Sequence, residues 1–475
     1  MSKQKNLVKN TAIISIGRIC TQCISFFLLP LYTAILSTNE YGSVDLLISY
    51  SSLLLPIVTF AIEQALFRYL IDVRSDKEKK EVIISTTAFF MLIQCLLCLI
   101  VLFVIQLFIK NEYMPIFSIM LIACALSASM LQLSRGLGDN VGYAMGSFVT
   151  ALIQILCNIL FLVEFKMGAN GMLLATFAGN ISCTIFLFFK LRTFKYIRIK
   201  SYDKSILREM LKYSLPMIPN QLSWWTMNAS DKTIVAMFLG TASNGLLAVS
   251  HKFPNIYMQF SNIFNISWTE AATLHINDGD AQEFFTDIIN KMIRLFSCAC
   301  VVIIVCIPFV YNWLVNINYF DAYYQIPIFM MSSLGNVIVS LYGVIYVANK
   351  KTKEIAKTAF YAALINACTH LILIKFIGLY AASISSLIGY WAMAIYRYFH
   401  SRKYITVKLP IKLLAAIAIM IGIAVVPYYT QNLIMQIIAF VCIFTMSIIM
   451  NRVLLKSVLA MVKQFLEKMK KKHMN

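Results

Sequence analysis

Charged and titratable side chains interrupt several long apolar stretches of the chain, and they are the first candidates for chemistry. A charge inside a membrane span is costly, so such residues usually face a polar cavity and contact a substrate or a transported ion. Basic groups would bind an anion there, and carboxylates would bind a proton or a sodium ion. The basic candidates for substrate binding are Arg18, Arg68, Lys232 and Lys252, and the acidic candidates for ion coupling are Asp231, Glu63 and Glu270.

Asp231 and Lys232 are informative because they are adjacent in the sequence. Neighbouring residues on a helix point in directions about 100° apart, so these two side chains cannot simply neutralise each other. At least one of them is expected to face a polar interior. His251 and Lys252 interrupt a later apolar stretch in the same way. Since basic groups outnumber acidic groups among the residues inside the stretches, we expect an anionic substrate.

Plainer interpretations apply to several candidates. Arg18 lies about three turns into the first apolar stretch, from which a long side chain can extend to the membrane surface. Glu63 and Arg68 lie near the end of a stretch and could pair with each other. His370 is the lone histidine of its stretch, and a lone histidine is more often hydrogen-bonded to a neighbour than part of a site.

No catalytic or metal-binding arrangement is recognisable. Two cysteine pairs have CxxC spacing, Cys20 with Cys23 and Cys95 with Cys98, but both pairs lie in apolar stretches. Cysteine in that setting acts as a small apolar residue, so we expect no metal, no redox function and no cofactor. The predicted outer loops are short and contain no acid–base pair, so an enzyme is not expected.

The composition requires most of these elements to lie in a membrane. Of the 475 residues, 60% are apolar and 13% are charged, whereas soluble domains have about 25% charged residues. Soluble cytoplasmic enzymes, nucleic-acid-binding domains and secreted disulfide-linked scaffolds are therefore disfavoured. At roughly 20 residues for each membrane-spanning helix, the chain has room for about fourteen spans. The predicted fold is an all-α polytopic membrane protein with spans at residues 10–36, 42–65, 82–109, 114–134, 141–165, 168–189, 211–239, 243–268, 292–315, 324–348, 355–374, 379–399, 409–428 and 433–455.

The distribution of charge predicts the orientation of these spans. The chain has 41 Lys and Arg residues against 21 Asp and Glu residues, a net charge of +20. With both termini in the cytoplasm, roughly 35 of the 41 basic residues lie on the inner side, as the positive-inside rule requires. Residues 270–294 depart from this pattern, since this amphipathic inner segment is net acidic. The basic balance thus reflects the membrane, not nucleic acid, and the tail after residue 456 is expected to form a basic helix on the membrane surface.

The chain also contains an internal repeat. LSTNEYG at residues 36–42 aligns with LGTASNG at residues 239–245, an offset of 203 residues, and KMGANGMLLATFAGN at 166–180 aligns with FIGLYAASISSLIGY at 376–390, an offset of 210. Each half contains six spans with the same orientation, which is typical of transporters that alternate access to a site between the halves. We predict a bundle over 1–200, a second bundle over 201–405, two additional spans over 406–455 and a cytoplasmic tail over 456–475, with hinges at Pro30, Pro216 and Pro219.

Four segments resemble the polysaccharide-biosynthesis flippases of the Wzx type. FFLLPLYTAILSTNEYG (26–42) is similar to their first-span signature and EQALFRY (63–69) to the end of their second span. LKYSLPMIPNQLSWWTMNASDKTIV (211–235) is similar to the start of their second half, and NGLLAVSHK (244–252) to their eighth span. The chain departs from the pattern at Lys232, where the family usually has Arg after Asp, and at Leu247 and His251, where it is usually rich in tyrosine.

The resemblance implies a flippase of the multidrug/oligosaccharidyl-lipid/polysaccharide exporter superfamily in the bacterial cytoplasmic membrane. Its substrate would be an undecaprenyl-pyrophosphate-linked oligosaccharide, as in O-antigen synthesis, moved from the inner to the outer leaflet by alternating access. Basic residues in the lumen would receive the pyrophosphate, and membrane lipids and the polysaccharide polymerase machinery would be partners. The alternatives are a cation-coupled multidrug and toxin extruder of the same superfamily, for which more carboxylates are expected, and a membrane glycopolymer polymerase, which needs a large outer loop.

Overall fold

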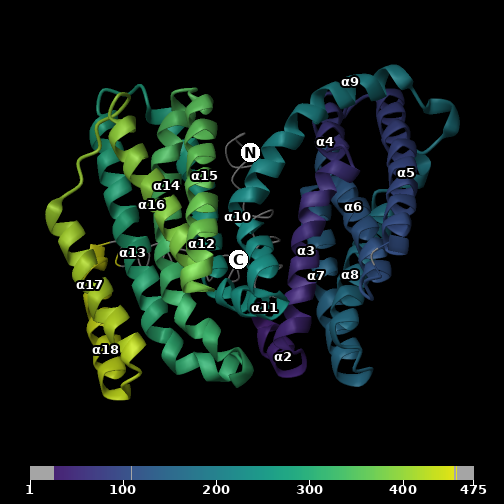
Figure 1. The fold of residues 1–475 in the computed structure, drawn as a ribbon. Coiled ribbons are helices and arrows are strands. Elements are labelled where there is room, and N and C mark those ends of the chain that lie inside the picture. The colour runs from purple at the N-terminus through teal and green to yellow at the C-terminus, as the bar shows by residue number, and fades with distance from the viewer. Residues whose placement is uncertain (1–25, 109, 454–455, 457–475) are drawn as a thin grey trace, which may run out of the picture. The chain divides into compact units, whose positions relative to one another are not determined.

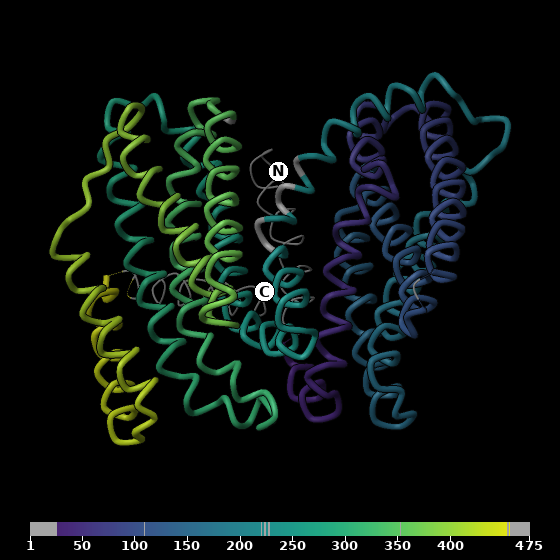
Figure 2. The backbone as a smooth tube through the Cα atoms, in the orientation of Figure 1, coloured from purple at the N-terminus to yellow at the C-terminus, as the bar shows by residue number. Residues whose placement is uncertain are grey.

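The computed structural model describes residues 26–108, 110–453 and 456, and these residues form helices and connecting turns without a β-strand (Figure 1). Contacts divide the chain into two compact units. The first unit is the chain up to Lys252 together with Val315–Tyr319 and His370–Ala382. The second unit is Phe253–Leu314, Phe320–Thr369 and the chain from Ser383. Within each unit the helices run side by side as a bundle (Figure 2), so the predicted all-α fold is confirmed.

The first unit contains most of the elements up to residue 252. Its elements are α2 (Leu29–Ile35), α3 (Thr38–Val58), α4 (Ile62–Asp72), α5 (Lys77–Phe108), α6 (Met114–Gly136), α7 (Asn140–Ile159), the π-helical turn η1 (Leu160–Glu164), α8 (Gly168–Lys190), the short 3₁₀ helices η2 (Thr193–Lys195), η3 (Ile199–Ser201) and η4 (Leu215–Met217), α9 (Lys204–Ser214), α10 (Ile218–Leu239) and α11 (Thr241–Ser250).

The second unit contains most of the later helices. They are α12 (Lys252–His275), α13 (Ala281–Leu314), η5 (Ile317–Gln325), α14 (Ile326–Ala348), α15 (Thr352–Ile377), α16 (Tyr380–Ser401), α17 (Ile411–Thr430) and α18 (Leu433–Met450). Four of them also contribute residues to the first unit. The first residue of α12 is Lys252, η5 begins within Val315–Tyr319, and α15 ends and α16 begins within His370–Ala382.

Ten helical segments of the described chain are long and apolar enough to cross a membrane, and each coincides with one predicted span. Three further predicted spans are also helical, as α10, as α11 with α12, and as α16. The first predicted span lies mainly in residues 1–25, and the predicted tail helix lies after residue 456, so both fall largely or wholly outside the described residues. Many apolar side chains of these helices are exposed, including Leu107 and Phe108 of α5 and Ile434 of α18. Such surfaces are stable in lipid and unstable in water, so the chain is a multi-pass membrane protein.

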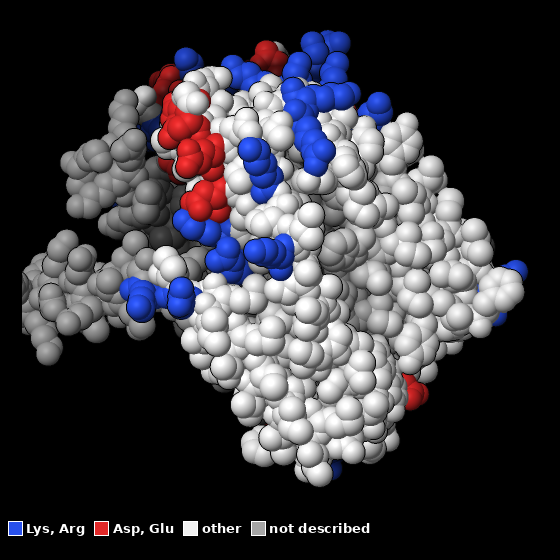
Figure 3. Space-filling view, turned by 90° about the vertical axis from the view of Figure 1, so that its left-hand side faces the viewer, with Lys and Arg blue, Asp and Glu red and all other residues white. Residues whose placement is uncertain are grey.

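Charged side chains leave a broad surface free of charge. On the face shown in Figure 3, Lys, Arg, Asp and Glu gather towards one end, and the surface beyond them is almost wholly uncharged. This distribution is the one expected of helices whose middle portions face hydrocarbon.

The second predicted span is two helices, not one. Pro56 lies inside α3 and removes one backbone hydrogen-bond donor. Phe60 and Ala61 then adopt left-handed backbone conformations with φ of 52° and 50°, which an α-helix does not accommodate. The Thr59 hydroxyl stabilises the break, because it donates to the Leu55 carbonyl at 2.9 Å and accepts from the Ala61 backbone N–H at 3.1 Å. The break separates α3 from α4.

The acidic segment 270–294 is likewise not a separate element. Its first residues continue α12 to His275, residues 276–280 form a turn, and the remainder belongs to α13, a single helix from Ala281 to Leu314. The predicted boundary at residue 292 therefore falls inside a continuous helix.

Two glycines allow α3 and α11 to cross with their backbones in contact. A Cβ atom on Gly42 would overlap the carbonyl oxygen of Thr241, and a Cβ atom on Gly245 would overlap the carbonyl oxygen of Thr38. The Asn244 side chain donates a hydrogen bond to the Gly42 carbonyl at 2.7 Å. The two glycines are equivalent in the sequence repeat, and so are the two threonines. The repeat-related segments therefore contact each other reciprocally, while the predicted division at residues 200 and 405 stays a prediction.

In the second unit, η5 and α14 form the centre. In the most apolar 18-residue stretch of this segment 67% of the residues are buried, whereas 11% are buried in the corresponding stretch of α18. The Trp268 indole N–H of α12 donates to the Leu341 carbonyl of α14 at 3.2 Å. Tyr428 stacks on Tyr323 with ring centroids 4.2 Å apart and donates to its carbonyl at 2.8 Å. The contacts between these tyrosines join η5 to α17, which is the first of the two additional spans.

The three predicted hinge prolines lie at the starts of helices. Phe27 is helical and Leu28 is a turn, so Pro30 lies in the first turn of α2 after an interruption of the helix. Pro216 lies in η4, and Pro219 lies in the first turn of α10. Proline is well tolerated at these positions because the first turn of a helix has no intrahelical partner for its N–H groups. Whether the helices move about these points stays a prediction.

Candidate functional site

Six ionisable residues of the first unit lie within otherwise apolar helices, and we call them the polar cluster. They come from four segments that are far apart in the sequence: α3, α10, the junction of α11 and α12, and the end of α15. Only α10 and the α11–α12 junction are near each other in the sequence. The packing of the helices therefore brings the other segments together. The members are Asp45, Asp231, Lys232, His251, Lys252 and His370.

Lys232 forms an ion pair with Asp45. Its Nζ lies 2.8 Å from Asp45 Oδ2, and the side chains are 20% and 14% exposed. Asp45 lies three residues after Gly42, about one helical turn from the close crossing of α3 and α11. The ion pair therefore joins α10 to α3 next to a point where the backbones are already in contact.

Asp231 forms a hydrogen bond with His370. The distance from His370 Nδ1 to Asp231 Oδ1 is 2.8 Å, and the side chains are 0% and 6% exposed. An ionised Asp231 can only accept this hydrogen bond, and Nδ1 of His370 is then the donor. As predicted, Asp231 does not neutralise its neighbour Lys232, because adjacent residues of α10 point towards different helices.

His251 and Lys252 lie at the junction between α11 and α12. His251 ends α11, and it lies within electrostatic reach of Lys232, Asp231, Asp45 and Lys252. Lys252 is the first residue of α12 and is close enough to Asp45 to interact with its charge. Among the described residues, none of the ion pairs includes Lys252. Its ammonium group is thus the cation of the polar cluster that is not already committed to a carboxylate.

The other predicted site residues lie elsewhere or outside the described chain. Arg68 is exposed on α4 and pairs with Asp72 at 2.6 Å, not with Glu63. Glu63 is buried in the first turn of α4, and its Oε2 has no hydrogen-bond partner among the described residues. Glu270 is exposed on α12 in the second unit. No described hydrogen bond or ion pair joins these residues to the polar cluster, and Arg18 lies outside the described residues.

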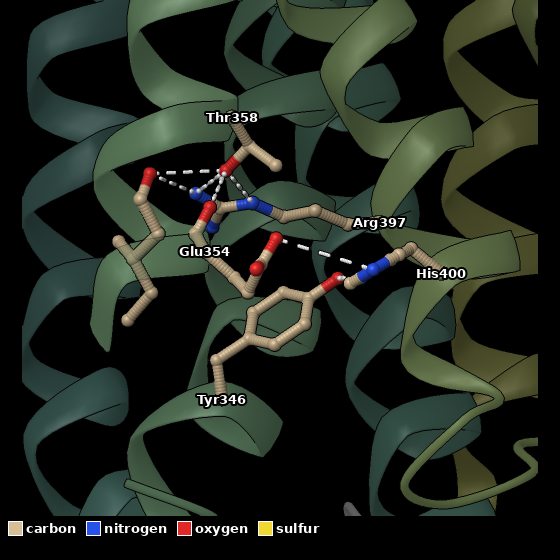
Figure 4. A network of polar contacts seen from close by, with 6 residues as sticks. Tyr346, Glu354, Thr358, Arg397 and His400 are labelled. Atoms are coloured by element: carbon tan, nitrogen blue, oxygen red, sulfur yellow. Dashed lines mark hydrogen bonds and ion pairs between the residues drawn. The ribbon is translucent and has the colours of Figure 1, made fainter. Parts of the chain in front are cut away.

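A second polar network lies in the second unit (Figure 4). Arg397 of α16 is buried, and its guanidinium donates to the Thr358 hydroxyl at 2.8 and 3.1 Å and to the Val339 carbonyl at 3.0 Å. Beside it, His400 contacts the Tyr346 hydroxyl at 3.1 Å and lies 4.0 Å from Glu354. Because the guanidinium is bound to α14 and α15, this network holds three helices together.

Residues 7–273 match the family model of polysaccharide biosynthesis proteins. The match covers more than half of the 475 residues. The chain belongs to the polysaccharide biosynthesis protein family. No curated protein sequence matches it.

The fold of this family member is similar to that of solved membrane transporters. An inward-facing multidrug resistance MATE family transporter of the MOP superfamily aligns with a TM-score of 0.66 at 14% identity, over 82% of this chain and 94% of its own. An outward-facing MATE family transporter aligns with a TM-score of 0.59 at 14% identity, over 83% and 94%. A MOP superfamily transporter from Pyrococcus furiosus is described as having a binding pocket of reverse polarity. It aligns with a TM-score of 0.60 at 14% identity, over 85% of this chain and 96% of its own. The chain therefore has the MATE-like transporter fold.

Asp45 is the member of the polar cluster that the sequence analysis missed. It lies inside a predicted span, as Asp231 does, and this position was the signal that could have found it. With Asp45 included, two carboxylates balance two lysines, and the charge of the described cluster depends on its two histidines. The described cluster is thus neutral when both imidazoles are neutral. Arg18, which the sequence analysis counted towards a positive surplus, lies outside the described residues. No group of three or more potential metal ligands occurs in the described part of the chain.

Proposed function

We propose that the chain is a flippase that moves an undecaprenyl-pyrophosphate-linked oligosaccharide from the inner to the outer leaflet of the bacterial cytoplasmic membrane by alternating access. Membership of the polysaccharide biosynthesis family and a MATE-like transporter fold support this proposal. The observation that carries it is the polar cluster, in which Lys252 has no ion pair among the described residues.

A flippase of this kind solves two physical problems. Each sugar hydroxyl costs several kcal/mol, on the order of 4–8, when it enters hydrocarbon without a hydrogen-bond partner. An oligosaccharide therefore needs a polar path across the membrane. The pyrophosphate carries negative charge and needs a cation inside the protein. Lys252 would supply that charge as a point cation, and Lys232 and Arg18 would add to it.

The same proposal fixes orientation and partners. Both termini would lie in the cytoplasm, since the inner loops carry most of the basic residues. The lipid tail would stay in the bilayer while the head group crosses. The polymerase machinery of polysaccharide synthesis would take the delivered units at the outer side.

Transport in proteoliposomes tests the proposal directly. A fluorescent undecaprenyl-pyrophosphate-linked oligosaccharide should move between leaflets only when the protein is present, as measured by a reagent that cannot cross the membrane. Lys252→Ala should slow this movement about tenfold or more, because the pyrophosphate loses its cation. Lys353→Ala is the matched control, since Lys353 is an exposed lysine near the start of α15. Equal transport by both variants would contradict the role of Lys252, and no transport by the unmodified protein would contradict the proposed function.

A multidrug and toxin extruder is the alternative, and the structural neighbours support it, because two of them are multidrug resistance transporters. In that case cationic amphiphiles would be exported and the deletion strain would become sensitive to them. Under the flippase proposal the deletion strain would instead accumulate lipid-linked units that face the cytoplasm, with unchanged drug sensitivity.

A further inference from the structure

The imidazole of His370 is buried, and one of its nitrogens has no hydrogen-bond partner among the described residues. Its side chain is 0% exposed, and Nδ1 is bound to the Asp231 carboxylate at 2.8 Å. Nε2 has no hydrogen-bond partner within the described part of the chain. Since the carboxylate holds the tautomer with hydrogen on Nδ1, the lone pair of Nε2 is available. A buried polar atom left in this state costs free energy, so its retention calls for a function.

The ligand that fits this atom is a proton. The lone pair of Nε2 can accept a proton, and the positively charged ring that forms would lie beside the Asp231 carboxylate. Sodium fits poorly, because hard cations are bound by several oxygen ligands, whereas here a nitrogen occupies the position beside the carboxylate. No described group of three or more acidic, histidine or cysteine side chains stands nearby to bind a metal.

A proton at His370 would change the charge of the whole polar cluster. On α10, Asp231 contacts His370 and Lys232 follows it directly. Asp45 on α3 pairs with Lys232, and the buried Tyr41 on the same helix interacts with Asp45. The α11–α12 junction adds His251 and Lys252, both within reach of these charges. With two carboxylates and two lysines in balance, one proton on His370 makes the cluster net positive.

We propose that His370, paired with Asp231, is a proton-binding site whose occupancy is linked to the binding of the anionic substrate. This inference rests on the proposed function for the identity of the anion. The linkage has a fixed sign, because an added positive charge attracts the pyrophosphate and the bound pyrophosphate attracts the proton. Reciprocity requires that each ligand strengthen the other by the same factor. Substrate affinity therefore rises as the pH falls, and substrate binding takes up a proton.

Binding of undecaprenyl-pyrophosphoryl-N-acetylglucosamine to the detergent-solubilised protein tests the linkage. This probe is a pyrophosphate diester, so its own charge does not change near neutral pH. From pH 8 to pH 6 the dissociation constant of the unmodified protein should fall about tenfold, within the usual range for coupled sites. His370→Gln should bind the probe with no pH dependence, because an amide takes up no proton. The binding-induced proton uptake, read with a pH indicator in weak buffer, should also be lost.

The exposed pair of His275 and Asp278 provides a matched control. Its Nδ1–Oδ2 distance is 2.6 Å, but both side chains are about half exposed. His275→Gln should keep the full pH dependence of binding. The same pH dependence in His370→Gln as in the unmodified protein, or its loss in His275→Gln, would overturn the inference.

A measurement without ligand separates this inference from the proposed function. In ¹⁵N-histidine-labelled protein, one imidazole signal should convert to imidazolium between pH 8 and pH 5 and should be absent from His370→Gln. If the signal titrates but the probe does not bind, the proton site stands and the flippase proposal fails. If the probe binds and no His370 signal titrates, the proton site is wrong and the flippase proposal stands.

Discussion

At the scale of single residues, α10 directs two adjacent charges to two different helices. Lys232 reaches Asp45 on α3, and Asp231 reaches His370 on α15. Both contacts are largely screened from water, so each has a larger effect than an exposed pair of the same geometry. The side chains of Lys232 and Asp231 therefore help to hold α10 against α3 and against the end of α15.

Removing one partner of the Lys232–Asp45 pair should destabilise the protein. Asp45→Asn leaves the lysine charge in a mostly buried position without its counter-ion, which costs about 1–3 kcal/mol. The unfolding temperature in detergent should fall, and adding Lys232→Met to the same chain should recover part of the loss. Asp72→Asn is the control, since it removes the partner of Arg68 in an exposed pair and should have little effect. An equal fall in both single variants would show that burial of the Lys232–Asp45 pair does not matter.

Gly343→Ala tests how tightly Arg397 is held. A Cβ atom at residue 343 would lie 2.6 Å from Arg397 Nη1, so the guanidinium would have to leave the Val339 carbonyl and lose a buried hydrogen bond. We expect a loss of about 1–3 kcal/mol, measured as a lower unfolding temperature. In Gly422→Ala the new methyl group meets nothing within 4 Å, so this helical substitution should be neutral or stabilising by about 0.5–1 kcal/mol. Similar behaviour of the two variants would mean that the network in Figure 4 adapts without cost.

At the scale of elements, the crossing of α3 and α11 is the most restrictive feature of the first unit. The contact is between backbones, and neither chain can relieve an overlap by rotating a side chain. Equivalent residues of the repeat meet there, which is the arrangement expected where an axis of internal symmetry passes between two segments. The polar cluster begins about one turn further along α3.

Substitution of either glycine at this crossing should separate the two helices. Gly42→Ala and Gly245→Ala should have effects of similar size, at least about 1–3 kcal/mol, because the contact is reciprocal. The displaced helices would also pull Asp45 away from Lys232, so transport should fall together with stability. Gly279→Ala is the control, because nothing lies within 4 Å of the added methyl group. Normal stability and transport in both crossing variants would show that the helices do not need this close approach.

At the scale of the whole molecule, the distribution of charge divides the chain into surfaces of different environment. Apolar side chains cover the middle portions of the helices, and most charges outside the polar cluster lie towards helix ends and connections. We therefore expect the charge state of the few ionisable side chains inside the described spans to affect the proposed transport.

The membrane potential should drive the proposed outward movement. A pyrophosphate diester with two negative charges gains roughly 4–5 kcal/mol per 100 mV when it crosses the full field of an inside-negative membrane. If one proton moves with the pyrophosphate, the net charge that crosses is −1 and the gain in free energy falls to about 2.3 kcal/mol per 100 mV. With equal pH on both sides, a potassium diffusion potential should therefore speed flipping in vesicles, and His370→Gln should show the steeper voltage dependence.

Two outcomes would count against this electrical model. If the flipping rate of the unmodified protein does not change with the membrane potential, no net charge crosses the field. An unchanged voltage dependence in His370→Gln would mean that the proton does not travel with the substrate.

The sequence alone determined the class of fold and most of the elements. Long apolar stretches bounded by charge predict membrane helices because the cost of exposing backbone polar groups to lipid leaves few alternatives. The ten apolar helices fall where those stretches lie, and the family follows from motifs in the chain. Asp231, Lys232 and Lys252 are also evident as charges inside spans. Breaks such as Phe60–Ala61 were missed, because hydropathy continues unchanged through a local backbone turn.

Only the tertiary structure decided which charges meet. Asp231 and His370 are 139 positions apart, and Lys232 and Asp45 lie on helices whose packing no local pattern reports. From the sequence, His370 was a lone histidine and Asp45 was not considered, because a side chain's function in the cluster depends on its partner and the partner comes from another helix. Spans depend on local hydropathy and can be derived residue by residue. The protonation and pairing of the cluster depend on distances of a few ångströms between distant segments, which are set when the bundle packs.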